Sequence, residues 1–183
     1  SKPWAGVFEW LTNQTDLPVI TTYKPSGTFT FQGPAGKLYT VPEVIDIINE
    51  ALLANSETQK FYLIRRERSF TLVPADEKID PTLLPRIAME ELDQRGNTEM
   101  VSIVLPLTTL VAEDVAPEIK KMMGPFGEVV PMTRANQLIL QDTVANLKRI
   151  RKTIKDIEQN ENQVQAESLN HECKYIKARD AER

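Results

Sequence analysis

The stretch from Val101 to Ile157 limits what this chain can fold into more than any other part of it. It opens with an apolar run of strand length and continues into a helical segment that ends at Gly124-Pro125-Phe126-Gly127. Two short apolar segments, 128–132 and 137–140, flank a four-residue turn, and an amphipathic run follows over 144–157. The pattern predicts a strand, a helix, a β-hairpin and a second helix. Such a unit can bury a core of its own, and it contains no reaction chemistry.

A preceding unit, residues 1–75, also alternates helical and strand patterns. Its clearest signal is Thr40-Val41-Pro42-Glu43, where a threonine cap, a proline in the first turn and a glutamate three residues after the cap predict a helix start. This unit is therefore expected to be a small sheet packed by two helices. The expected order is helix, strand, strand, helix, strand and strand, at residues 4–11, 19–22, 28–31, 41–52, 61–64 and 70–73.

A length of 183 residues suits two small domains. We expect an α+β protein in which each domain is a small mixed sheet packed by two helices. The expected boundaries are a first domain over 1–75, a linker or joint over 76–98, a second domain over 99–160, and a connection with the start of a further domain over 161–183. Within the joint, a short strand and a helical turn are expected to end at Gly96 in a left-handed conformation.

The last residues resemble a restart of the second domain. When Val104–Glu113 is shifted forward by 69 positions, it falls on Cys173–Glu182 with two identities and one apolar match. A new strand and helix start are what a repeated domain would show at this position. The chain is therefore interpreted as a fragment of a longer protein.

The composition excludes several classes of site. One cysteine and one histidine rule out an internal disulfide framework, a multi-cysteine metal site and any site that needs two histidines. A net charge of -4 argues against a general binder of polyanions, although it allows a local basic patch. No apolar run approaches the ~18–20 residues that a membrane-spanning helix needs. No catalytic, cofactor-binding or metal-binding residues are therefore assigned, and an enzyme is not expected.

The Gly124–Gly127 segment leaves two interpretations open. It matches the GxxG loop with which KH domains hold a nucleic-acid backbone, where glycines let phosphates approach main-chain N–H groups. In KH domains this loop joins two helices, whereas here a strand follows. A helix end and turn is the simpler interpretation. The alternative, a nucleic-acid-binding module, predicts RNA binding that Gly127→Asp abolishes while the fold is retained.

One face of the 144–157 helix is basic, and it is the best candidate for an oligomer interface. It is either a solvated surface or a contact with aspartate and glutamate residues of a neighbouring subunit. Phe126 and Trp10 are expected to be partly exposed, and an aromatic side chain outside the core can mark a contact, so Phe126 is added to the candidate interface. The basic residues are Lys148, Arg149, Arg151, Lys152 and Lys155.

Several segments of the second unit together resemble the N1-type, ring-building domain of bacterial secretins, the outer-membrane channel subunits of type II secretion and type IV pilus machines. The most specific is Asn136-x-Leu138-Ile139-x-x-Asp142, followed by the helix that carries Asn146, Arg149 and Ile150. The other matching segments are 104–107, 112–116, 124–130 and 135–143. The resemblance implies that this domain is KH-like in fold and that it assembles with copies of itself.

The first unit is similar to the N0 domain of secretins, which is related to the signalling domain of TonB-dependent receptors. A receptor signalling domain is a further alternative, but it leaves the second unit unexplained. The joint over 76–98 is longer than the resemblance leads us to expect, and no channel-forming domain is present in the chain. The matching residues are Trp4, Gly27–Phe31, Tyr39, Thr40, Glu43 and Asn49.

The resemblance implies a structural function. The chain is expected to be the periplasmic portion of a bacterial outer-membrane protein, whose N domains stack into a homo-oligomeric ring below the channel. Its first domain is expected to dock an inner-membrane coupling protein, and its cargo to be a secreted protein or a pilus. No nucleic-acid partner and no cofactor are expected.

Overall fold

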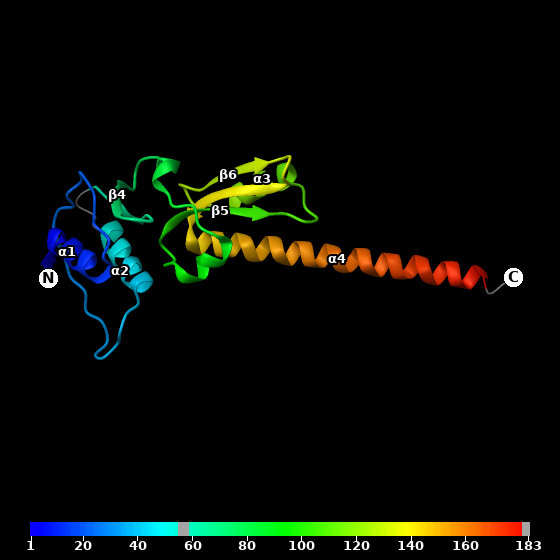
Figure 1. The fold of residues 1–183 in the computed structure, drawn as a ribbon, viewed down its shortest axis with the longest axis horizontal. Coiled ribbons are helices and arrows are strands. Elements are labelled where there is room, and N and C mark those ends of the chain that lie inside the picture. Colours follow the sequence, from blue (N-terminus) through cyan, green and yellow to red (C-terminus); the bar gives the residue numbers. More distant parts are fainter. Residues whose placement is uncertain (55–58, 181–183) are drawn as a thin grey trace.

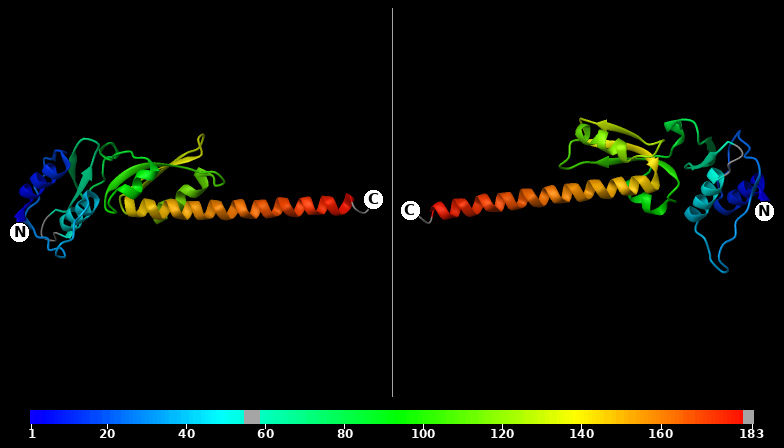
Figure 2. Two further views of the ribbon diagram at one scale, coloured as in Figure 1. Left: turned by 60° about the horizontal axis from the view of Figure 1, so that its bottom comes forward. Right: turned by 180° about the vertical axis from the view of Figure 1, so that it is seen from behind.

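A computed structural model describes residues 1–54 and 59–180 of the chain, with side chains described up to residue 169. The protein is α+β, as predicted, and consists of two units joined by a packed segment (Figure 1). A long C-terminal helix projects beyond both units (Figure 2). Sheets in both units are short and antiparallel, and parallel pairing occurs among the described residues only as isolated bridges. The KH-like part of the prediction stays a prediction.

In the first unit, residues 1–75, two helices pack against a β-hairpin. Apolar side chains such as Leu11, Ile48 and Phe70 form its core. The second helix starts at the predicted capping box: the Thr40 N–H donates to the Glu43 carboxylate at 2.8 Å, and the Glu43 N–H donates to the Thr40 hydroxyl at 3.4 Å. The elements are β1 (Lys2–Pro3), α1 (Trp4–Thr15), β2 (Thr28–Phe29), α2 (Val41–Ala54), β3 (Phe61–Arg65) and β4 (Phe70–Pro74).

The two strands predicted over 19–22 and 28–31 are shorter than expected. Only Val19 of the first segment pairs, through a parallel bridge to Phe70, and the second segment is reduced to β2. The Ile20 N–H donates to the Phe70 carbonyl and the Phe70 N–H donates to the Pro18 carbonyl, both at 2.8 Å. Pro18 has no backbone N–H to donate, so the strand hydrogen bonds with β4 cannot continue toward the N-terminus through this residue.

The second unit, residues 99–160, has the predicted order of strand, helix, hairpin and helix. Its sheet is antiparallel in the order β5–β7–β6, with Leu140 of the central strand opposite Ile103 and Val129. Residues from both helices share one core with the sheet, so both helices cover the same face. The elements are β5 (Met100–Pro106), α3 (Ala112–Met122), β6 (Glu128–Met132), β7 (Gln137–Thr143) and α4 (Val144–Asp180).

The segment 76–98 is a packed joint rather than a free linker. It contains two 3₁₀ helices, η1 (Pro81–Leu83) and η2 (Met89–Gln94). Ile79 and Leu84 are buried in a small cluster that contains residues of both units, while Leu92 joins the core of the second unit. The joint therefore fixes the two units together through apolar contacts. Its two prolines and several charged residues make these contacts hard to predict from the sequence.

Gly96 is not the left-handed helix cap that the sequence predicts, because the glycines with positive φ are Gly27 and Gly36. Glycine is required at this position because a side chain would not fit. A Cβ atom at position 96 would lie 2.5 Å from the Asp46 carboxylate and 2.7 Å from the Pro42 carbonyl oxygen. Glycine therefore permits the joint to approach α2 closely.

Polar contacts also connect the units across this approach. The Asp46 carboxylate accepts the backbone N–H groups of Asn97 and Thr98 at 3.0 and 2.8 Å. The Glu99 carboxylate, whose side chain is 1% exposed, pairs with Arg65 of β3 and receives the Gly96 N–H at 2.6 Å. Charges buried this deeply are stable only when they are paired and hydrogen-bonded.

Helix α4 is longer than predicted. It was expected to end near Ile157, with a connection and a new strand over 161–183, but it continues to Asp180. No proline or glycine interrupts residues 144–180, and glutamate, glutamine, lysine and alanine in this range favour a helix. The expectation of a connection and strand is therefore wrong for 161–180, and residues 181–183 lie outside the described residues.

Candidate functional site

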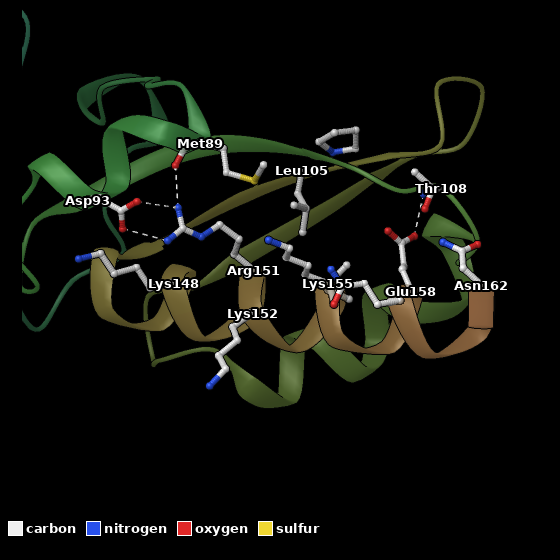
Figure 3. Close-up of a pocket in the computed structure, with 13 residues that line it drawn as sticks. Met89, Asp93, Leu105, Thr108, Lys148, Arg151, Lys152, Lys155, Glu158 and Asn162 are labelled. Carbon is white, nitrogen blue, oxygen red and sulfur yellow. Dashed lines mark hydrogen bonds and ion pairs between the residues drawn. The ribbon is translucent and has the colours of Figure 1, made fainter. Parts of the chain in front are cut away.

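A groove of about 820 Å³ lies between α4 and the β5 edge of the second unit (Figure 3). Met89 of η2, Leu105 of β5 and Ile154 of α4 give it an apolar floor. Four of the five predicted basic residues of α4 line the groove, namely Lys148, Arg151, Lys152 and Lys155. Lys155 reaches over the groove, while Lys152 points away from its floor (Figure 3). We call this feature the basic groove.

Arg151 anchors α4 to the joint. Its guanidinium donates to the Asp93 carboxylate at 2.9 Å and to the Met89 carbonyl at 3.1 Å (Figure 3). The hydrogen bond from Arg151, together with the charges of Arg151 and Lys148, holds the pKa of Asp93 below its ordinary value. Arg151 therefore has a partner inside its own chain, and its place in an oligomer interface stays a prediction.

Arg149 lies on another side of α4. Its guanidinium donates to the Asn146 side-chain oxygen at 2.8 Å and to the Met122 carbonyl, at the end of α3, at 3.4 Å. Lys148, Lys152 and Lys155 line the basic groove, and none of them forms an ion pair within the part of the chain that the structure describes.

Phe126 contacts the first unit of its own chain. Its ring meets Tyr62 edge-on, with the ring centroids 5.8 Å apart, and it packs against the cluster that joins the two units. Phe126 is therefore partly exposed, as predicted, and its part in an oligomer interface stays a prediction. A helical count cannot show this contact, because Tyr62 is 64 positions away in the sequence.

Glu158 closes one end of the basic groove and holds the loop before α3. Its carboxylate accepts the backbone N–H groups of Thr108, Thr109 and Leu110 at 2.7, 3.0 and 3.2 Å. Burial alone raises the pKa of Glu158, but these three N–H donors outweigh burial and keep the pKa below its ordinary value. No local sequence pattern indicates this contact, because it joins positions about 50 residues apart.

Glu158→Gln is expected to destabilise the protein by about 1–2 kcal/mol at neutral pH, because the three N–H groups lose a charged acceptor. Glu158 has a lowered pKa in the folded state, so its contribution is present above the unfolded-state pKa and is lost as pH falls through the folded-state pKa. Urea unfolding of both proteins at pH 7 and near pH 3 measures this. A gap that stays constant between the two pH values would contradict it.

The Gly124–Gly127 segment is a turn, as the simpler interpretation predicts. The Gly127 N–H donates to the Gly124 carbonyl at 3.0 Å, and the Gly124 N–H donates to the buried carboxylate of Asp142 at 2.9 Å. The Lys120 ammonium contacts the Gly127 carbonyl oxygen. A phosphate at this turn would meet the Asp142 carboxylate and find the Gly124 N–H already used. The geometry therefore argues against a KH-type nucleic-acid site.

The motif that carries the secretin resemblance has a structural explanation. Asn136 has a left-handed backbone, with φ of 48°, at the β6–β7 turn. Its side chain accepts the Ala112 N–H at 2.9 Å and donates to the Leu110 carbonyl at 2.9 Å, so it fixes the start of α3. Asp142 fixes the other end of α3 through Gly124 and also accepts the Asn146 side-chain amide at 3.2 Å. The motif residues position a helix rather than a substrate.

The first unit contains an exposed apolar surface around Trp10, a residue that the sequence predicts to be partly exposed. Val7, Trp10, Phe31 and Tyr39 line one hollow of about 280 Å³, in which Trp10 is 41% and Phe31 is 46% exposed. A surface of this kind suits protein contacts.

The described residues contain no group of three or more metal-ligating side chains. Among the same residues, no helix is both long and apolar enough to cross a membrane.

Residues 102–163 match the family model of the bacterial type II/III secretion system short domain. The match includes the β-hairpin and most of the second unit. It agrees with the prediction of a secretion-system component rather than an enzyme. None of the curated proteins compared with this chain matched it.

Three solved structures were among those similar to the chain. One is the N-terminal domain of the secretin XcpQ from Pseudomonas aeruginosa, at 13% identity over 86% of this chain and 62% of that one, with a TM-score of 0.31. The GspC–GspD complex of the enterotoxigenic Escherichia coli type II secretion system is 13% identical over 85% of this chain and 92% of that one, with a TM-score of 0.32. The Salmonella SPI-1 type III injectisome basal body proteins InvG, PrgH and PrgK give 10% identity, 87% and 27% coverage and a TM-score of 0.34. The chain spans 62% of the length of the XcpQ structure, and the family model covers only residues 102–163.

Proposed function

We propose, from the membership of residues 102–163 in the bacterial type II/III secretion system short domain family, that this chain is a periplasmic part of a secretin-like channel protein. In this proposal the second unit builds a ring with identical copies, and the ring forms a vestibule wall below an outer-membrane pore. The domain match is the observation that carries the proposal.

The structure of the second unit suits such a role. Its core is complete within β5, β6, β7, α3 and α4, with support from Ile87 and Leu92 of the joint, so its outer surfaces are free for contacts. Identical copies that meet through two different surfaces form a closed ring when the rotation between neighbours closes. Weak contacts suffice in such a ring, because each subunit is held on both sides.

The first unit is proposed to dock an inner-membrane coupling protein. This part of the proposal rests on the resemblance of Trp4, Gly27–Phe31 and Asn49 to the N0 domain. The exposed apolar surface around Trp10 and Phe31 is compatible with a protein partner. Through the packed joint, a partner bound to the first unit would be rigidly connected to the ring. The cargo is proposed to be a secreted protein or a pilus.

The proposal is tested on the full-length parent protein, extracted from cell envelopes with detergent and viewed by negative-stain electron microscopy. Closed rings with a central chamber are expected. A soluble monomer that is absent from the envelope fraction would contradict the proposal.

A further inference from the structure

We propose that α2 couples the apolar hollow of the first unit to the joint, so that a partner side chain in the hollow strengthens the hold of the first unit on the second. This inference rests on the proposed function, because it takes the docked coupling protein as the occupant of the hollow. It adds a form of regulation: docking at the first unit tightens the connection between the two units.

Helix α2 lies between α1 and the second unit (Figures 1 and 2). One side of α2 faces the hollow, where Val44 and Ile47 lie together with Trp10 of α1. Another side holds the joint through Asp46 and Asn49. At about 100° per residue, these two pairs of α2 residues lie on opposite sides of the helix. A shift or rotation of α2 therefore changes the contacts at both places.

The hold on the joint is a small set of hydrogen bonds that share one hydroxyl group. The Asp46 carboxylate accepts the Asn97 N–H at 3.0 Å, the Thr98 N–H at 2.8 Å and the Thr98 hydroxyl at 2.6 Å. The Asn49 side-chain amide donates to the same hydroxyl at 3.1 Å and accepts the Leu63 N–H of β3 at 2.8 Å. Movement of α2 away from the joint therefore weakens several hydrogen bonds at once.

The hollow side of α2 is packed less closely. Val44 and Ile47 are half-buried, and Trp10 is 41% exposed. The hollow of about 280 Å³ leaves this side without the close packing of a protein core. A side chain that fills the hollow gains its contacts only while α2 stays in place, so occupancy restricts α2. Once α2 is restricted, the entropy cost of holding the joint is lower, and the coupling is positive.

The test uses the 183-residue chain without a partner. Trp4→Phe leaves Trp10 as the one tryptophan of the chain, so acrylamide quenching of its fluorescence measures access to the hollow. Hydrogen exchange of the Thr98 amide measures the hold on the joint. In this background, Asp46→Asn is expected to speed the Thr98 exchange about tenfold, because a charged acceptor is lost. The coupling is expected to raise the quenching of Trp10 about twofold in the same variant.

Val44→Ala is the reciprocal variant, since a coupling free energy acts equally in both directions. It enlarges the hollow on the side of α2 away from the joint, and it is expected to speed the Thr98 exchange as well. The matched control on the same helix is Glu50→Gln, an exposed position that is expected to change neither measurement. A second control, Arg95→Gln, weakens the joint away from α2 and is expected to leave the quenching of Trp10 unchanged.

Each outcome decides. The coupling is supported if exchange and quenching change together in Asp46→Asn, and exchange rises in Val44→Ala, while the control on α2 changes neither. An unchanged Thr98 exchange in either variant overturns it, and so does unchanged quenching in Asp46→Asn. Quenching that rises equally in Arg95→Gln would show a general loosening and would also overturn it. None of these measurements involves the ring or the partner, so failure of the coupling leaves the proposed function standing.

Discussion

Glu99→Ala is expected to lower the free energy of unfolding by about 3–5 kcal/mol, the cost of removing one partner from a buried ion pair. The Glu99 carboxylate receives the Arg65 Nε and Nη2 groups at 2.8 and 2.9 Å, and the Arg95 Nη1 group lies 3.4 Å away. Without the carboxylate, two guanidinium groups with 17% and 16% exposed side chains lose their anion. Urea unfolding of the chain measures the change.

Glu91→Ala is the matched control, because Glu91 is an exposed glutamate of η2 in the same joint. It is expected to change the free energy of unfolding by about 0.5 kcal/mol or less. A loss below about 1 kcal/mol for Glu99→Ala would show that the pair does not hold the units together. Arg65 belongs to the first unit and Glu99 to the second, so this ion pair is one of the contacts that connect the two units.

Gly127→Asp is expected to destabilise the second unit by about 3 kcal/mol or more, through overpacking and the burial of an unpaired charge. A Cβ at this position would lie 2.5 Å from the Met123 Cβ and 2.9 Å from the Asp142 carboxylate. The new carboxylate would then lie against an existing one. The nucleic-acid alternative expects this substitution to leave the fold intact, so the same variant separates the two interpretations.

Gly6→Asp is the control for Gly127→Asp. A Cβ at Gly6 meets no atom within 4 Å, and the residue lies in the first turn of α1, where an acidic side chain is favourable. Thermal unfolding of both variants is expected to show a large loss for Gly127→Asp and little or none for Gly6→Asp. A fully folded Gly127→Asp variant that has lost affinity for RNA would contradict the turn interpretation.

The second unit could be predicted from the sequence because its pattern is local. Alternate burial of Leu138 and Leu140 marks the strand β7, and the spacing of Leu147, Ile150 and Ile154 marks the buried face of α4. The capping box at Thr40 was equally readable. In each case, the signal and the structure that it specifies lie within a few residues of each other.

The joint could not be predicted in the same way. Ile79 and Leu84 are buried because residues of both units surround them. No helical or strand periodicity in the sequence predicts this burial. The pairing of the candidate interface residues could not be predicted from the sequence either. The basic stripe of α4 was visible, but only the fold separates Arg151, which pairs with Asp93 58 residues away, from Lys152 and Lys155, which stay unpaired.

The most direct test of the central claim, that the second unit builds a ring wall, is a cryo-electron microscopy reconstruction of the full-length particle. We expect a ring of density in which copies of residues 99–160 stand side by side and contact one another. A ring wall that excludes these residues, or copies of them that do not touch, would contradict the account.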